Sequence, residues 1–440
     1  MADFPPAKRY RSLFSACTLS LVFVLAAGPA SADPGTDWTP ATPPGVIVTP
    51  TRLLPEVIPL PTEKVPLPMP PMVPAEPYQP FFEIDWSVAL LASRTGGTRG
   101  SRYATTLVPQ FTATRTGLRS SFVFGAEARL GVNSDQLTRV ENVLLSANAE
   151  YALDSVTRLS ATASLSLNQD DPNAPGSSDQ IIQTPLEGNA QVQLGIARQF
   201  GRFALALDTE LSRDQQTDTI LVGNVIRQNL DRNVTELGTT LRGEFELTPI
   251  LTGFVEGSVA RNWYDAAPQD TNIRQDGWDL ALSTGLAANW RDVFQIEASV
   301  GLGERRFEDA SIDNFSSLLY AFDFAYTPNN ALALDAQLST ALTPANAPSG
   351  SQASTDYAIT TGASYQIAPW VGLRGSLGQS WSVPGTDPVQ SWNFYAGTGI
   401  DFALNKNIAL NLDYLYTKAQ TLPRIPENSH QISMGLTWSR

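Results

Sequence analysis

The side chains best able to do chemistry in this 440-residue chain are carboxylates, because it contains only one histidine and one cysteine. His430 stands next to Ser429, the pair of residue types that a hydrolase would use as base and nucleophile. Successive side chains of a strand point to opposite faces, so these two neighbours are poorly placed for proton transfer. We interpret His430 as a residue at the outer rim of a strand and expect no enzyme activity.

A carboxylate site for a metal ion is the remaining chemical possibility. Asp170, Asp171 and Asp179 lie close together in segment 168–187 and could supply the oxygen ligands that Ca²⁺ prefers. Such residues more often solvate a loop, and we favour that interpretation. No glycine-rich phosphate loop and no paired catalytic carboxylate motif is evident, so no cofactor is expected.

The charge balance restricts the partners. The chain has a net charge of −14, which argues against nucleic acid as a partner because phosphate binding needs a basic face. Its only cysteine, Cys17, lies in a segment that we expect to be removed. The mature chain would then have neither disulfides nor thiolate metal sites.

The N-terminal segment has the pattern of a secretory signal peptide, predicted over residues 1–32. It combines a basic start at Lys8, Arg9 and Arg11 with an apolar run from Leu19 to Ala27. An Ala-Ser-Ala cleavage motif ends at Ala32. A lipid anchor on Cys17 is disfavoured, since the apolar run follows the cysteine.

Residues 33–80 are rich in proline without a regular period. Proline lacks the N–H donor that helices and sheets require, so we predict a disordered, extended linker in the periplasm. At about 3.1 Å per residue it could reach roughly 140 Å. A peptide that enters the lumen of the following domain is the alternative.

Residues 81–440 show weak apolar–polar alternation and no helical period. Eighteen strands are predicted, at 81–93, 103–113, 118–132, 140–153, 157–167, 188–198, 202–212, 234–247, 251–263, 278–290, 293–304, 316–326, 331–342, 357–367, 370–381, 391–404, 407–417 and 429–439. From the second strand onward, tight turns alternate with longer loops rich in Asp, Asn, Pro, Gly and Ser. This alternation is typical of an all-β, transmembrane, antiparallel up-and-down barrel with short periplasmic turns and longer extracellular loops. About 18 strands are expected, with 16–18 plausible.

Aromatic residues support this topology. If the first strand runs outward, they collect near both ends of the strands, where membrane interfaces favour Trp and Tyr. The predicted girdle residues are Trp86, Tyr151, Trp263, Trp278, Trp290, Tyr320, Tyr326, Tyr365, Trp370, Trp381, Trp392, Tyr416 and Trp438.

The opposite faces of the same strands are polar and acidic. Burying so many carboxylates in a dry core would cost several kcal/mol each, so we expect a water-filled lumen. The predicted lumen-lining residues are Asp85, Glu127, Arg129, Glu150, Asp208, Glu210, Arg242, Glu244, Glu256, Asp279, Glu297, Asp323, Asp335, Arg374, Asp401 and Asp413. Arg242 could pair with Glu244 on this face.

The hairpin block from residue 231 to 265, which contains the strand-to-turn sequence ELTP, resembles the outer-membrane β-barrel porins of Gram-negative bacteria. The type-2 β-barrel porin domain is the most similar, and the likeness covers roughly residues 81–440. It implies an outer-membrane location and a barrel, but no particular substrate. One departure is that Trp438 is followed by Ser439 and Arg440, whereas such barrels commonly end in an aromatic residue that the assembly machinery reads.

These patterns predict passive diffusion of small polar solutes or ions, with a weak preference for cations. The expected partners are outer-membrane lipid and the barrel-assembly machinery; the oligomeric state is not readable from the sequence. A plugged structural or surface barrel is an alternative, with loops that bind a partner or a role in polysaccharide export. A soluble β-protein adhesin is a third hypothesis.

Overall fold

The computed structural model describes residues 31–33, 36–38, 81–98, 100–134, 138–172, 180–268, 272–344, 353–385, 391–421 and 425–440. Eighteen antiparallel strands form one closed barrel. They are β3 (Glu83–Gly97), β4 (Gly100–Thr116), β5 (Ser120–Asn133), β6 (Thr138–Ala152), β7 (Thr157–Gln169), β9 (Leu186–Phe200), β10 (Phe203–Gln216), β13 (Val234–Thr248), β14 (Leu251–Tyr264), β15 (Gly277–Trp290), β16 (Phe294–Phe307), β17 (Phe315–Asn329), β18 (Leu332–Pro344), β19 (Ala353–Ala368), β20 (Val371–Pro384), β21 (Ser391–Ala403), β22 (Ile408–Thr421) and β23 (Glu427–Ser439). The predicted fold class is confirmed, and the strand number is eighteen.

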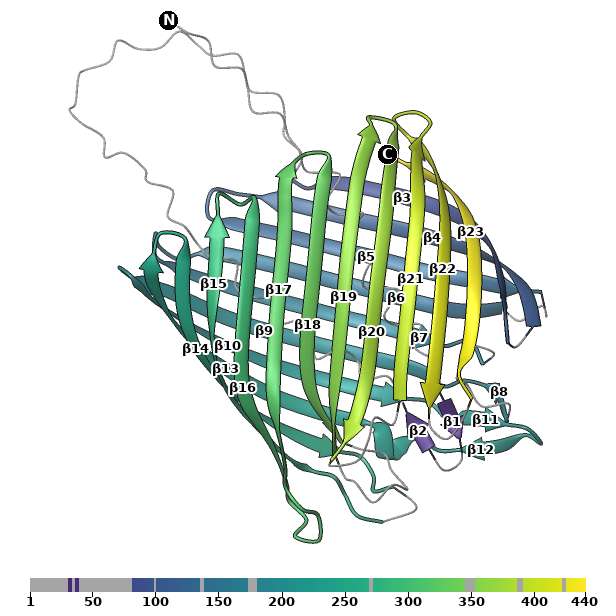
Figure 1. The fold of residues 1–440 in the computed structure, drawn as a ribbon, viewed down its shortest axis with the longest axis horizontal. Helices are drawn as coiled ribbons and strands as arrows, with labels where there is room; N and C mark the ends of the chain where they lie inside the picture. The colour runs from purple at the N-terminus through teal and green to yellow at the C-terminus, as the bar shows by residue number, and fades with distance from the viewer. Residues whose placement is uncertain are drawn as a thin grey trace, which may run out of the picture.

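Each strand of the barrel pairs with the strands before and after it, and the last pairs with the first. Closure joins β23 to β3, with Trp438 opposite Val88. The N–H of Arg440 also donates to the carbonyl of Trp86 at 3.0 Å. The C-terminus and the start of β3 therefore lie at the same end of the barrel (Figure 1). We call it the turn end, because the tight turns are there, and the other the loop end.

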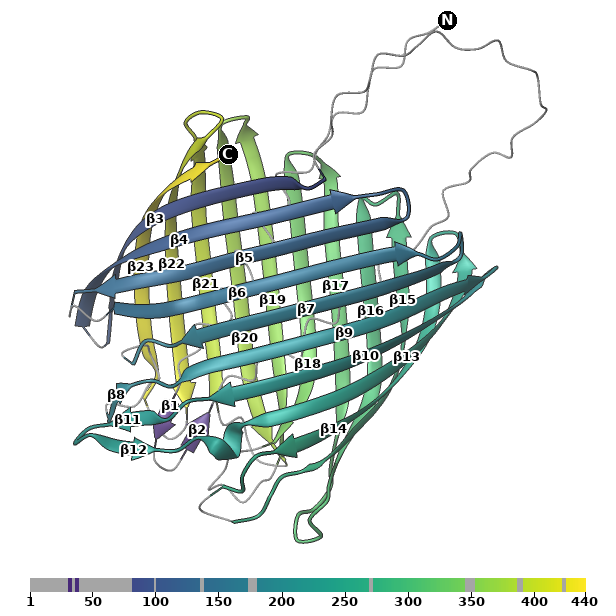
Figure 2. The ribbon, with the colours of Figure 1, turned by 180° about the vertical axis from the view of Figure 1, so that it is seen from behind.

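Short elements complete the described structure. At the loop end, β8 (Ile181–Gln183), β11 (Thr219–Leu221) and β12 (Val225–Arg227) form a three-stranded sheet beyond the barrel (Figure 2). A 3₁₀ turn follows at Leu230–Arg232. A separate pair, β1 (Ser31–Asp33) and β2 (Thr36–Trp38), precedes the barrel; otherwise the predicted signal peptide and linker lie outside the described residues. No helix among the described residues is long and apolar enough to span a membrane.

Three of the tight turns at the turn end begin with a side chain that accepts two backbone hydrogen bonds. Asp154 accepts from the N–H groups of Val156 and Thr157 at 2.8 and 2.7 Å. Asn329 and Asn405 make the same pair of contacts in their turns. Short polar side chains favour this geometry, which fixes where one strand ends and the next begins.

Alternation of exposure follows the pleat. In β9, Val192, Leu194 and Ile196 are 47%, 59% and 43% exposed on the outer face. Gln191 and Gln193 point to the other face. This separation places apolar side chains outside and polar ones inside, as a barrel surrounded by lipid requires.

Several places depart from a regular ladder, among them a register shift between Arg129 and Leu130 of β5. Pro109 has no N–H, and neither it nor Val108 pairs with β5. Between β17 and β18, pairing stops at Phe322 and Leu338, so the loop-end half of this seam has no backbone ladder. There, the Thr340 hydroxyl accepts from the N–H of Tyr320 at 3.2 Å and donates to its carbonyl at 3.0 Å.

Candidate functional site: the inner wall of the barrel

Ion pairs between distant strands identify the inner face. Arg242 on β13 bonds to both carboxylate oxygens of Glu297 on β16 at 2.7 and 3.0 Å. These strands are separated by β14 and β15, and side chains from them can meet only on the concave side of the sheet. Leu241, on the opposite face of β13, is exposed.

The pairing registers place every predicted lumen residue on this inner face. Residues opposite each other in adjacent strands share a face, and residues two apart along a strand do so too. Through these registers, Asp208, Arg242, Glu256, Asp279, Glu297, Asp323, Asp335, Arg374, Asp401 and Asp413 lie on one continuous inner surface, as do Asp85, Glu127, Arg129, Glu150, Glu210 and Glu244.

One cluster surrounds Arg242. Its guanidinium contacts Glu244 at 2.8 Å, Glu256 at 3.5 Å and Glu297 at 2.7 Å, and lies 3.7 Å from the centre of the Phe254 ring. The pairing expected between Arg242 and Glu244 is therefore present. One cation serves three carboxylates, so the cluster has a formal excess of negative charge.

A second cluster surrounds Arg374. Its Nε contacts Asp401 at 2.6 Å and its terminal nitrogen contacts Asp413 at 2.9 Å. On this face the Tyr395 ring fills the space beside Gly378, where a Cβ atom would overlap it. The site has again fewer cations than carboxylates.

Smaller groups use the other basic residues. Glu127 is only 4% exposed, and accepts from Gln110 at 2.7 Å and from Arg129 at 3.2 Å. Arg305 donates to both oxygens of Asp279, at 2.7 and 2.5 Å. Each buried or half-buried arginine of the inner wall is therefore neutralised by carboxylates.

Several predicted acids are not brought into these clusters. In the described part of the chain, Asp208, Glu210, Asp323 and Asp335 form no ion pair. Glu150 approaches Arg158 only at 3.8 Å. The inner wall thus carries carboxylates that no basic side chain compensates.

The sequence did not lead us to predict Arg305 or a group of charged side chains at the loop end as part of the inner wall. Asp171 pairs with Arg102 at 2.8 Å and with Arg139 at 3.4 Å, which anchors the connection after β7 to β4 and β6. All three arginines lie just beyond the predicted strand ends. The strands extend past the apolar band that defined those ends, and continuing the alternation would have found these residues.

The arrangement of the described side chains supports neither the carboxylate metal site nor the Ser429–His430 pair. Asp171 is occupied by arginines, Asp179 lies outside the described residues, and the described ranges hold no group of three His, Cys, Asp or Glu side chains able to bind a metal ion. His430 is on the outer face, where its Nδ1 lies 2.7 Å from the Tyr414 hydroxyl. Ser429 belongs to the inner face of β23, so the two do not form a nucleophile–base pair.

The predicted girdle residues within strands all lie on the outer face. At the turn end, Trp86 and Trp438 pack edge to face with ring centres 4.9 Å apart. At the loop end, Trp381 stacks on Tyr357 at 5.2 Å. Trp370 lies in a turn and is exposed. This distribution matches two membrane interfaces.

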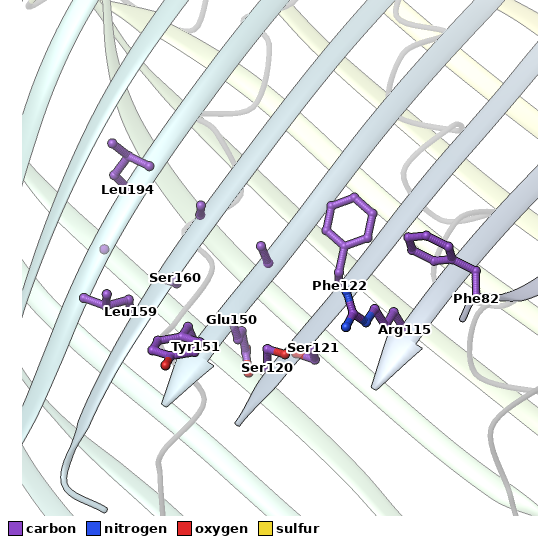
Figure 3. A pocket seen from close by; sticks show the side chains of 13 residues that line it. Phe82, Arg115, Ser120, Ser121, Phe122, Glu150, Tyr151, Leu159, Ser160 and Leu194 are labelled. Atoms are coloured by element: carbon purple, nitrogen blue, oxygen red, sulfur yellow. The ribbon is translucent and has the colours of Figure 1, made fainter. Parts of the chain in front are cut away.

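A pocket at the turn end is lined by residues of both faces, among them Phe122 and Tyr151 of the outer face and Glu150 of the inner face (Figure 3). Phe82 packs edge to face against Phe122, and Arg115 covers the ring of Phe81 at 3.7 Å. Phe122 and Arg115 belong to the outer faces of β5 and β4. The described chain therefore reaches β3 along the outside of the barrel.

Comparison with known proteins adds a family. Residues 80–438 match the family described as "Putative beta-barrel porin 2". The chain belongs to this porin family. No curated protein matches it.

Three similar solved structures share little sequence identity with this chain, and two of them, OpdK and OmpT, are outer membrane proteins. OccK3 (OpdO) of Pseudomonas aeruginosa is 11% identical, with 81% of this chain and 96% of that chain covered and a TM-score of 0.40. OpdK of the same organism is 8% identical, with coverages of 81% and 99% and a TM-score of 0.40. A loop-deletion mutant of Vibrio cholerae OmpT is 10% identical, with coverages of 82% and 100% and a TM-score of 0.33.

Proposed function

We propose that this outer-membrane porin lets small polar solutes and ions diffuse passively through its lumen, with a weak preference for cations. The observation that carries the proposal is the charge of the inner wall. The sixteen predicted lumen residues comprise thirteen carboxylates and three arginines, and Arg242 and Arg374 each contact more than one carboxylate. Uncompensated carboxylates around a pore attract cations and repel anions.

The decisive measurement is the reversal potential of the purified protein in a planar bilayer that separates unequal KCl concentrations. The sign should correspond to faster passage of K⁺ than of Cl⁻. Replacing Asp208, Glu210, Asp323 and Asp335 by their amides should reduce that preference, since these four acids lack a basic partner. An anion preference in the unmodified protein would contradict the proposal.

A plugged barrel whose loops bind a partner is the second candidate. It is favoured by the anchoring of Asp171 to Arg102 and Arg139 and by the three-stranded sheet at the loop end. Single-channel conductance separates the two candidates, because an open lumen passes ions steadily and a plugged one does not. Repeating the measurement without residues 33–80 would show whether the proline-rich segment obstructs the lumen.

A further inference from the structure

Three nitrogen-bearing side chains form a group on the outer face near the loop end, which we call the cationic patch: Arg94, Lys418 and His430. Arg94 is three residues before the end of β3, Lys418 three before the end of β22, and His430 three after the start of β23. These strands are neighbours, so the three side chains lie near the same end of the barrel.

The registers also place them close together. His430 lies opposite Tyr416, two residues from Lys418, while Arg94 lies opposite Ile432, two residues from His430. Such diagonal neighbours on one face of a sheet are about 7–8 Å apart. His430 is therefore between the two permanent cations, within reach of a single ligand of several atoms.

The contacts of the patch are aromatic rather than acidic. The Arg94 guanidinium lies 5.7 Å from the Tyr103 ring centre, and the Lys418 ammonium 5.4 Å from that of Trp392. A hydroxyl donated from Tyr414 to Nδ1 of His430 would leave the ring proton on Nε2. No carboxylate of the described residues forms an ion pair with the patch.

This lack of acid extends over a wide sector. Registers and alternation show that no Asp or Glu of β21, β22, β23, β3 or β4 points outward, although the chain contains 43 acidic residues. Near the loop end, other outer-face arginines of the described strands have acidic partners: Arg261 pairs with Glu308 and Arg306 with Glu304, both at 2.8 Å. Within the described loop-end part of the outer face, the cationic patch is thus free of neighbouring carboxylates and can accept an external anion.

Below the patch, the surface suits an acyl chain. Ile432, Met434 and Leu436 continue the outer face of β23 toward the membrane centre and are 61%, 52% and 50% exposed. A cationic group at the interface above such a stripe complements an amphiphile with an anionic head and apolar tails. We propose that the cationic patch binds the phosphate of a lipid headgroup in the outer leaflet.

The test uses the full mature chain in detergent micelles, with diphosphorylated lipid A as the probe and native mass spectrometry as the readout. The variant R94Q/K418Q should bind lipid A roughly 30-fold more weakly, because each basic residue near a charged lipid surface contributes about 1 kcal/mol. The matched control R261Q/R306Q removes two outer-face cations that already have acidic partners, and its affinity should change less than about 2-fold.

Three outcomes would overturn the proposal: equal binding by R94Q/K418Q and the unmodified protein, equal binding of lipid A stripped of its phosphates, or complete displacement of lipid A by millimolar inorganic phosphate. The last would indicate a site for free phosphate. Retention of heat-resistant gel migration verifies that each variant is folded. Should the double variant fail to assemble, R94Q and K418Q alone should each weaken binding roughly 5-fold.

Discussion

Glycine residues on the inner wall provide room for aromatic rings. Gly378 leaves the space that the Tyr395 ring occupies, and Gly285 does the same for Phe254 beneath Arg242. In both cases the missing side chain is required by a neighbour on the next strand. Conformational freedom is not the reason, because both glycines lie in regular strands.

Replacing Gly378 by alanine should lower the free energy of unfolding by about 1–3 kcal/mol, since the new methyl group overlaps Tyr395 and must displace it. Urea unfolding in detergent micelles would measure the loss. Gly375 on the same strand is the control: a Cβ atom there has no heavy atom within 4 Å, so G375A should not destabilise the barrel. Equal losses in both variants would show that the ring contact is unimportant.

Arg242 is the residue on which three glutamates depend. R242M should lower the free energy of unfolding by roughly 3 kcal/mol. The Arg242 side chain is only 6% exposed, and removing its charge leaves the carboxylates of Glu244, Glu256 and Glu297 without their basic partner. The same variant should also increase cation preference in bilayers. The outer-face change R306M removes an exposed pair and should cost less than about 1 kcal/mol. An unchanged reversal potential in a folded R242M barrel would argue against a role of the cluster in selectivity.

Among the strands, the β17–β18 seam is joined by side chains over its loop-end half. Leu342 of β18 reaches Gly303 of β16, where a Cβ atom would lie 2.8 Å from it. Phe307, Ile312 and Ala353 form an apolar cluster at the same end. Unpaired backbone groups are costly in a membrane, and the Thr340 hydroxyl satisfies two of them on Tyr320.

Valine at position 340 keeps the shape of threonine and removes these bonds. T340V should lower stability by about 1–3 kcal/mol and increase hydrogen exchange at the Tyr320 amide. Thr361, on the outer face of neighbouring β19, makes no side-chain hydrogen bond in the described structure and gives the control T361V. Unchanged exchange at Tyr320 in T340V would refute the assignment.

The connection after β7 should respond to pH through Asp170. Burial, followed by the nearby charge of Glu187, raises the pKa of Asp170 well above its ordinary value. The folded state then holds the proton more tightly than the unfolded state, so stability falls as pH rises from about 4 through the raised pKa.

Thermal unfolding measured against pH should therefore show a slope that D170N reduces. Asp309, in the connection between β16 and β17, gives a control of opposite sign. Hydrogen bonds from the hydroxyl and N–H of Ser311 lower the pKa of Asp309, so its contribution is present above pH 4 and is lost in acid. If D170N leaves the pH profile unchanged, the burial of this carboxyl does not affect stability.

The charge of the inner wall acts over the whole lumen. Its effect on permeating ions should depend on salt, because the Debye length falls from about 10 Å at 0.1 M to about 3 Å at 1 M. The permeability ratio of K⁺ to Cl⁻ should therefore be larger around 0.1 M than around 1 M KCl. A ratio independent of salt would indicate selection by close contacts at a narrow site instead.

The sequence by itself determined the barrel fold with about eighteen strands, and it predicted the face of the strand on which each aromatic and acidic residue lies. These follow from a period of two, which fixes the face of each side chain once a strand is recognised. Arg242 and Glu244 could be paired in advance because they are two residues apart on one strand. The same rule would have found Arg305 had the strand been extended by one residue.

Only the tertiary structure decided which distant residues meet. The pairing of Arg242 with Glu297 depends on the curvature of the closed sheet, which brings strands separated by two others together on the concave side. The cationic patch depends on closure between β23 and β3, which are at opposite ends of the chain. The interrupted pairing between β17 and β18 could not be predicted from the sequence either. The alternation within one strand shows which face a side chain lies on, but not how many residues of that strand pair with its neighbour.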